Sequence, residues 1–244
     1  IKDCKMRNIT AVMNRELLSL FCSPIGYITI AGFWLVTGVL VLLTGVFSPG
    51  RPASLRDIFF FTPFVLTIIV PAISMRTLSE EYRTGTIETL MTAPISDAQM
   101  VLGKYLASLI FYVFMVAGTG VYLVLLEIFG NPDWMASLVA YFGLLLLGMF
   151  FMAFGMFASS LSRNQVVAWM LGAVPLLLFA CFGYFLTDRV EGVYRQALQQ
   201  INVMGRFNNF TLGVINFSGV VFFIAMTALF LFLAIKVVES RRWR

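Results

Sequence analysis

The feature that most constrains this chain is a series of apolar blocks, each about 20 residues long. At a rise of about 1.5 Å per residue, a helix of that length crosses a hydrocarbon core roughly 30 Å thick. Hydrophobic residues make up 60% of the chain and charged residues only 12%, which is more apolar than a soluble domain. The blocks therefore predict membrane-spanning helices rather than the core helices of a soluble protein.

Six such blocks are expected to span the membrane. Only residues 162–165 separate two of them, so these two are expected to form an antiparallel hairpin. Pro63 and Pro71 predict a kink in another. The fold class is therefore an all-α membrane protein in which residues 1–244 form a single domain. The expected spans are residues 25–47, 58–74, 101–129, 135–161, 166–187 and 217–238.

The segment before the first span, residues 1–24, is expected to lie on the membrane surface. Its apolar residues recur at helical spacing, while polar residues such as Arg15 occupy another face. This pattern predicts an interfacial amphipathic helix. Ser23 and Pro24 are expected to end it, because proline disfavours a helical residue before it and lacks a backbone donor.

The beginning of the chain is not interpreted as a removable leader. The first apolar block is too long for the core of a signal peptide, and no small-x-small cleavage pattern follows it. It is therefore taken as a span of the mature protein. Met6 is interpreted as the biological start, with residues 1–5 as an upstream remnant.

The orientation follows from the distribution of lysine and arginine, because basic residues are retained on the cytoplasmic side. Six spans place both termini on one side of the membrane. That side holds all 17 Lys and Arg residues except five, namely Arg51, Arg56, Arg189, Arg195 and Arg206. Both termini and the interval 76–99 are therefore expected to face the cytoplasm.

Composition argues against several classes of function. The net charge is +5, but the basic residues lie in short segments between apolar blocks, which fits membrane topology better than nucleic-acid binding. There is no histidine, and Cys4, Cys22 and Cys181 are far apart, so no metal site is predicted and the cysteines are interpreted as free thiols. An intramembrane hydrolase or transferase would lack its catalytic residues.

Two features bear on which classes of membrane protein fit this chain. A phosphate-binding loop requires G-x-x-x-x-G-K-[ST], but Tyr105 follows the single Gly-Lys pair, Gly103-Lys104. The chain is therefore expected to bind no nucleotide and no other cofactor itself. No charged residue is expected at the centre of a span, and Glu127 lies near the end of one. This disfavours an ion-coupled carrier, although an ATP-independent channel or secondary carrier stays open as an alternative.

The most informative polar stretch is the interval 76–99. It predicts an amphipathic cytoplasmic element that rests on the membrane and offers acidic side chains to a partner. The alternative is that its acids form an ordinary solvated face. Helical spacing groups Ile87, Leu90, Met91 and Pro94 on one side of this element, and Glu80, Glu81, Thr84 and Glu88 on another.

At fixed spacing this stretch contains Glu80, Glu81, Arg83, Gly85, Thr86, Glu88, Leu90 and Pro94, with Gly103-Lys104 following. In these matching residues it resembles the cytoplasmic loop of ABC-2-type permeases. The likeness extends over nearly the whole chain and includes Arg15-Glu16 and the segment 23–27. The ending, from Arg206-Phe207 to the tail 239–243, is similar to the gliding-motility-type subfamily.

The resemblance implies an ABC-2 permease fold of the type V exporter kind, working as the non-catalytic subunit of an export system. It implies that the interval 76–99 forms a coupling helix in a groove of a separate cytoplasmic ATPase subunit, which binds ATP and Mg²⁺. The eight matching residues of that stretch become candidate ATPase contacts, and Arg15 and Glu16 candidate contacts of the surface helix. A second permease, either the same chain or a paralogue, is implied as a further partner beside membrane lipid. The resemblance also implies a location in the inner membrane of a bacterium.

The outer half of the chain carries two further expectations. The loop 188–216 has intermediate polarity, and by resemblance it dips back into the outer leaflet as a re-entrant cap, where irregular backbone must be shielded. A plain surface helix pair is the alternative. Phe59, Phe60 and Phe61 fit either a path for an amphipathic cargo or ordinary lipid-facing packing.

Overall fold

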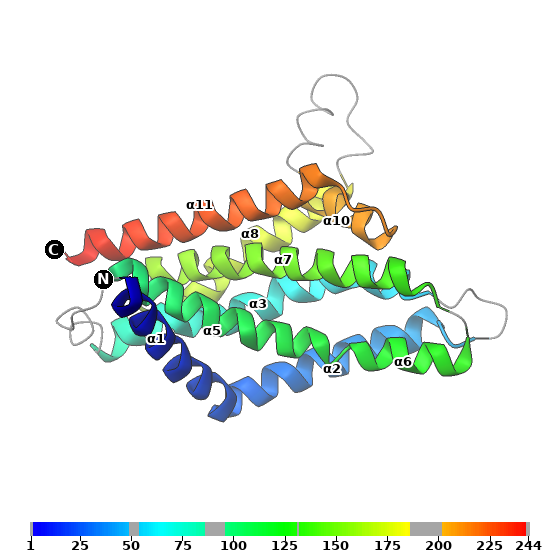
Figure 1. Cartoon of the computed structure of the whole chain (residues 1–244), viewed down its shortest axis with the longest axis horizontal. Coiled ribbons are helices and arrows are strands. Elements are labelled where there is room, and N and C mark those ends of the chain that lie inside the picture. The colour runs from blue at the N-terminus through cyan, green and yellow to red at the C-terminus, as the bar shows by residue number, and fades with distance from the viewer. Residues whose placement is uncertain (1, 49–53, 86–95, 131, 186–201, 243–244) are drawn as a thin grey trace, which may run out of the picture.

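The structure is a computed structural model that describes residues 2–48, 54–85, 96–130, 132–185 and 202–242. These parts of the chain are helical, and most of the helices run along the long axis of an elongated bundle (Figure 1). Both termini lie at the same end of that bundle, here called the terminal end. The helices are α1 (Lys2–Cys22), α2 (Pro24–Thr44), α3 (Arg56–Thr84), α5 (Asp97–Ala117), α6 (Gly120–Phe129), α7 (Trp134–Leu161), α8 (Gln165–Phe185), α10 (Val203–Thr211) and α11 (Phe217–Arg242).

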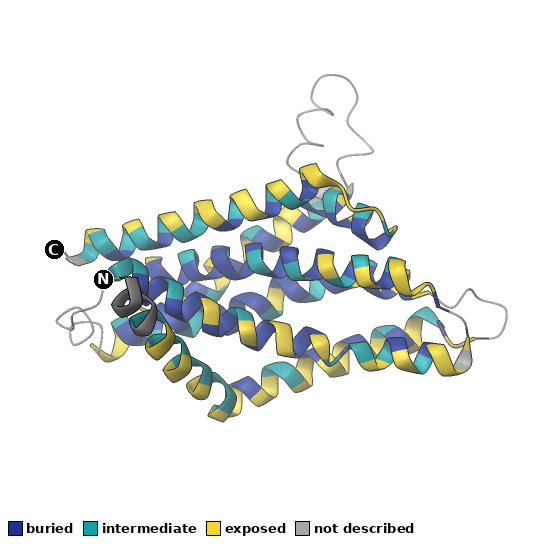
Figure 2. Cartoon of the chain, in the orientation of Figure 1, coloured by how far each residue is buried: buried dark blue, intermediate teal, exposed yellow. Residues whose placement is uncertain are grey.

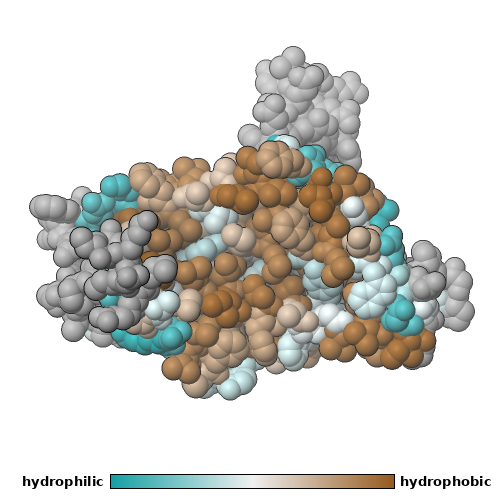
Figure 3. All heavy atoms as spheres, viewed as in Figure 1, coloured by the Kyte–Doolittle hydropathy of each residue, from teal (hydrophilic) through white to brown (hydrophobic). Residues whose placement is uncertain are grey.

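Five of the six expected spans appear as helical segments that are long and apolar enough to cross a membrane. They are Pro24–Thr44, Arg56–Thr84, Asp97–Ile128, Trp134–Leu161 and Phe217–Arg241. The remaining one, expected at residues 166–187, corresponds to α8, which runs over the 21 residues Gln165–Phe185. The visible face carries hydrophobic residues over its middle and hydrophilic ones toward the two ends, as a bilayer requires (Figure 3).

Helix α7 forms the centre of the bundle and packs against α3, α5, α8, α10 and α11. Most of its length is buried, whereas α2 and α11 expose much of their surface (Figure 2). The expected hairpin is confirmed, because α7 ends at Leu161, α8 begins at Gln165 and the two helices pack together.

The expected single helix over residues 101–129 is divided into α5 and α6 at Gly118 and Thr119. The Trp34 indole donates a hydrogen bond to the Met115 carbonyl at 2.9 Å, and a Cβ on Gly118 would lie 2.2 Å from the indole ring. The Thr119 hydroxyl donates to the Val116 carbonyl at 2.6 Å. The break therefore arises from the way α2 packs against this point, which local sequence does not reveal.

The helix of the second span extends well beyond the expected residues 58–74. Helix α3 continues to Thr84 and ends at Gly85, whose φ of 73° favours glycine. The continuation keeps Thr77, Leu78 and Glu81 buried, so tertiary packing extends the helix beyond its apolar block. The first part of the expected coupling element is thus the end of α3, and residues 86–95 lie outside the described chain.

The junction between α1 and α2 lies where the sequence predicts it. Helix α1 ends at Cys22, and Pro24 occupies the first turn of α2, as the Ser23-Pro24 pair predicted.

The loop expected at residues 188–216 contains a short helix. Helix α10 begins after Asn202, whose side-chain oxygen accepts from the Gly205 amide at 2.8 Å. Its buried residues, among them Phe210, pack toward α7. Residues 186–201 lie outside the described chain, so the re-entrant cap stays a prediction.

Candidate functional site

The candidate site lies at the terminal end, where α1, α3 and α5 meet. Helix α5 starts with a capping box, in which the Ser96 hydroxyl accepts from the Gln99 amide and the Gln99 side chain accepts from the Ser96 amide. Helix α1 then crosses α5 closely, because Gly103 has no side chain. A Cβ there would lie 2.9 Å from the Val12 side chain. This close crossing brings the next residue, Lys104, against α1.

Lys104 joins the three helices through two carboxylates. Its side chain is only 2% exposed, and its Nζ lies 2.5 Å from Glu16 Oε1 on α1 and 2.8 Å from Glu81 Oε1 on α3. The second oxygen of Glu81, Oε2, is buried and has no hydrogen-bond partner in the described chain. One buried cation therefore holds two acids from helices far apart in sequence. Removing either the lysine or an acid would leave a buried charge without its full set of partners, which destabilises the fold.

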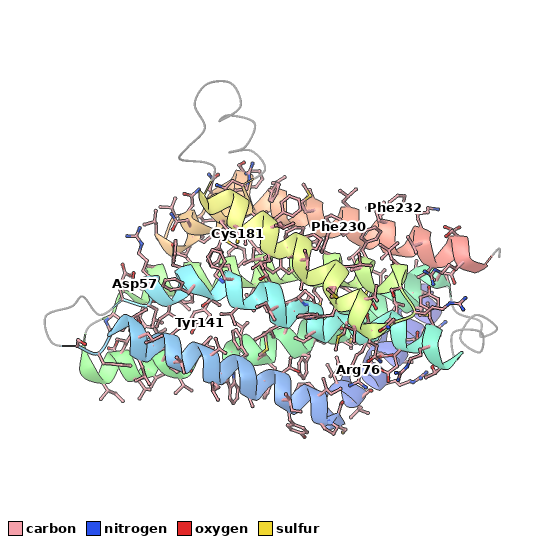
Figure 4. All side chains as sticks on the ribbon, turned by 180° about the vertical axis from the view of Figure 1, so that it is seen from behind. Asp57, Arg76, Tyr141, Cys181, Phe230 and Phe232 are labelled. Atoms are coloured by element: carbon pink, nitrogen blue, oxygen red, sulfur yellow. The ribbon has the colours of Figure 1, made fainter. Side chains whose placement is uncertain are left out.

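Arg76 links the end of α3 to the junction between α1 and α2. Its Nε donates to Glu80 Oε2 at 2.9 Å, and one terminal nitrogen donates to the Ser23 hydroxyl at 2.9 Å. Figure 4 shows Arg76 where α3 passes α1. Any shift of the α3 end is thus coupled to the turn that precedes the first span.

Helix α11 closes the same end of the bundle. The guanidinium carbon of Arg241 lies 4.5 Å from the centre of the Tyr82 ring, within range of a cation–π contact. One of its nitrogens donates to the Leu161 carbonyl, the last of α7, at 2.7 Å. We call this set of residues the terminal charge cluster: Glu16, Arg76, Glu80, Glu81, Lys104 and Arg241.

Beneath the cluster, Ser159 of α7 binds the backbone of α3. Its hydroxyl donates to the Met75 carbonyl at 2.9 Å and accepts from the amides of Leu78 and Ser79 at 3.2 and 3.1 Å. The side chain is fully buried. This one hydroxyl therefore sets the position of the α3 extension against the central helix.

We expect Ser159→Ala to lower the free energy of unfolding by about 1–2 kcal/mol, because it removes a buried partner of three backbone groups. Ser160→Ala is the matched control, since the equally buried Ser160 hydroxyl donates within its own helix, to the Phe157 carbonyl. Thermal unfolding of the detergent-solubilised variants measures both. Equal losses for the two variants would contradict a specific role of Ser159.

The structure separates the predicted site residues into three groups. Arg15, Arg83 and Gly85 are exposed, and Glu80 is partly exposed. Glu16 and Glu81 face Lys104 inside the chain. The expectation that Glu80 and Glu81 share one face is wrong, because Glu80 pairs with Arg76 at the partly exposed side of α3, whereas Glu81 is buried against Lys104. Thr86, Glu88, Leu90 and Pro94 lie outside the described residues.

Sequence reasoning missed Lys104, Arg76 and Arg241 as members of this site. A lysine just inside an apolar block was the available signal, because a charge at such a position is costly unless it is paired. Its partners could not be read from sequence, since 88 residues separate Lys104 from Glu16.

A helical bundle with five candidate spans and a charge cluster at one end defines a multi-pass membrane protein. A family model described as an ABC-2 family transporter protein matches residues 8–242. The chain therefore belongs to the ABC-2 family and is a membrane component of its transporters. No curated protein matches the chain.

Proposed function

We propose that this chain is the permease subunit of an ATP-driven ABC-2 export system, in which a separate cytoplasmic ATPase subunit docks at the terminal end. The family match over residues 8–242 supports the transporter class. The coupling role is supported by the terminal charge cluster. In it, Lys104 joins α1, α3 and α5 directly beside the exposed end of α3. ATP and Mg²⁺ would bind to the partner, since this chain has no phosphate-binding loop.

The exposed groups at this end offer a contact surface. Arg83 and Gly85 end α3, and Arg15 lies on α1 next to the residue that pairs with Lys104. Charged side chains fix the register of such a contact more than they raise its affinity. Glu81 would act by positioning the helices, because it faces Lys104. Closure of the ATPase subunits would then move α1 and α3 together and shift the spans.

The proposal extends to the partner permease, the subfamily and the location in the cell. The partner permease is a second copy of this chain or a paralogue, and the likeness of residues 206–243 to gliding-motility-type permeases points to that subfamily. The positive-inside pattern supports a cytoplasmic position of both termini, and the family resemblance supports the bacterial inner membrane. The direction of transport follows from the export character of the family resemblance.

The test compares ATPase recovery with three forms of the tagged permease purified from native membranes: wild type, Arg83→Glu and Glu80→Lys/Glu88→Lys. The charge reversals are expected to lose most of the co-purified ATPase activity. Arg83 is exposed and forms no ion pair in the described chain. Loss of the ATPase from Arg83→Glu would therefore not come from broken internal packing. Glu239→Lys is the matched control, since Glu239 is an exposed acid on α11 at the same end.

Retention of the ATPase by both charge-reversed forms would refute these contacts. If no ATPase accompanied even the wild-type permease, the ATP-independent channel or secondary carrier would become the better explanation. Size-exclusion profiles of all forms would verify that each remains folded.

A further inference from the structure

A hollow of about 740 Å³ opens at the end of the bundle opposite the termini, where α2, α3 and α10 come together. Its lining includes Leu40 and Leu43 of α2, Phe61 and the pair Arg56-Asp57 of α3, and Asn208 of α10. Figure 4 shows Asp57 at the end of α3 opposite Arg76. The hollow is thus separate from the terminal charge cluster.

The hollow has an apolar wall and a charged rim. Leu40 and Leu43 are three residues apart and share a helix face. Phe61 follows Asp57 by four residues, so the charged rim lies about 6 Å along the helix from the apolar wall. Leu43 and Phe61 are exposed by 78% and 43%. Such a gradient from charge to hydrocarbon matches the outline of an amphipathic molecule in a bilayer.

The rim offers a cation and an anion side by side. Arg56 and Asp57 are consecutive and exposed, at the start of α3. Across the hollow, the Thr211 hydroxyl shares its one proton between the Asn208 carbonyl at 2.8 Å and Asn208 Oδ1 at 3.0 Å. This contact on the oxygen side leaves the amide NH₂ group available to donate to a ligand. An anionic headgroup would meet Asp57, and a purely cationic one would meet Arg56. A headgroup that carries both signs satisfies the two residues together.

We propose that this hollow binds a zwitterionic phospholipid with a primary amine, such as phosphatidylethanolamine. Its phosphate contacts the Arg56 guanidinium and the Asn208 amide, through charge-assisted hydrogen bonds. Its ammonium donates to Asp57, which a quaternary choline cannot do. One acyl chain lies along Leu43 and Phe61. This site is independent of the ATPase docking proposed above.

The experiment is native mass spectrometry of the delipidated full-length protein, titrated in detergent with phosphatidylethanolamine, phosphatidylcholine or phosphatidylglycerol. The ethanolamine lipid is expected to bind tightest. Arg56→Gln should weaken its binding roughly tenfold, the usual order for losing one charge-assisted contact. Asp57→Asn should abolish the preference for ethanolamine over choline while leaving phosphate binding in place.

Two matched controls separate this site from general lipid binding. Arg163→Gln removes an exposed arginine from the link between α7 and α8 and is expected to leave binding unchanged. Leu43→Ala should weaken binding, whereas Leu42→Ala, a neighbour on α2 that is 77% exposed and outside the hollow, should not.

Equal affinity in Arg56→Gln and Arg163→Gln would overturn the proposal, as would a preference for the anionic glycerol lipid. Displacement of the lipid by soluble phosphoethanolamine or inorganic phosphate, with equal affinity for the headgroup alone, would show a site for a soluble ligand instead. Loss of a dimer, rather than of lipid, in Leu43→Ala would show that a second copy covers the hollow.

Discussion

Replacing Lys104 with methionine is expected to lower the free energy of unfolding by about 3–5 kcal/mol, because it leaves two acids in a site from which water is largely excluded. Glu16 and Glu81 both lie within 2.8 Å of the Lys104 ammonium, and the lysine is only 2% exposed. Without the cation, the two carboxylates repel each other across the junction of α1, α3 and α5. We therefore expect loss of folded protein at ordinary growth temperature.

Denaturant titration of the purified variants in detergent micelles measures this effect. Lys236→Met is the control, because Lys236 and Glu239 form an exposed pair, 54% and 45% accessible, whose loss should change stability by less than about 1 kcal/mol. Adding Glu81→Gln to Lys104→Met should restore part of the lost stability by removing one unpaired charge. Similar values for the two lysine variants would show that Lys104 is not electrostatically buried.

The second large effect is expected at the crossing of α5 and α7. A Cβ on Gly148 would lie 2.1 Å from two ring atoms of Tyr112 and 2.5 Å from its hydroxyl. The Tyr112 ring cannot swing aside, because it is fully buried and its hydroxyl donates to the Leu144 carbonyl at 2.8 Å. Gly148→Val is therefore expected to lower the free energy of unfolding by about 3 kcal/mol, the upper end of the usual overpacking range.

The same titration tests this prediction with a control and a suppressor. No described atom lies within 4 Å of a Cβ built on Gly32, so Gly32→Val should change stability by about 0.5 kcal/mol or less. Tyr112→Leu removes the ring that a larger residue 148 would meet, so the double variant should be more stable than Gly148→Val alone. If Tyr112→Leu instead added its own full loss, the ring contact would not be the cause.

Hydropathy predicted most of the fold because it measures the one property that a bilayer selects for. Five of the spans appear where apolar blocks predicted them, and the Ser23-Pro24 pair marked the junction of α1 and α2. The second span was expected to end at residue 74, since the polar residues that follow, such as Glu81, predicted a separate cytoplasmic element. Packing against its neighbours keeps that stretch helical as far as Gly85.

The candidate site was predictable only in part. The stretch that begins at Glu80 was recognised by its pattern, and family resemblance gave it a role. The pairing of Glu81 with Lys104 rather than with solvent depends on how α1 crosses α5 at Gly103. The polar lining of the opposite hollow depends on tertiary structure in the same way, because the amide of Asn208 on α10 comes from a segment far from Arg56 and Asp57 in sequence.

The sequence by itself determined that this chain is helical, crosses a membrane several times and carries no nucleotide loop, because these properties depend on composition and local spacing. Tertiary structure alone decided which charges meet. Glu16, Glu81 and Lys104 come from three helices, and their distances depend on close contacts at Gly103 and Ser159. Electrostatic pairing acts through space over a few ångströms, so no local pattern along the chain encodes it.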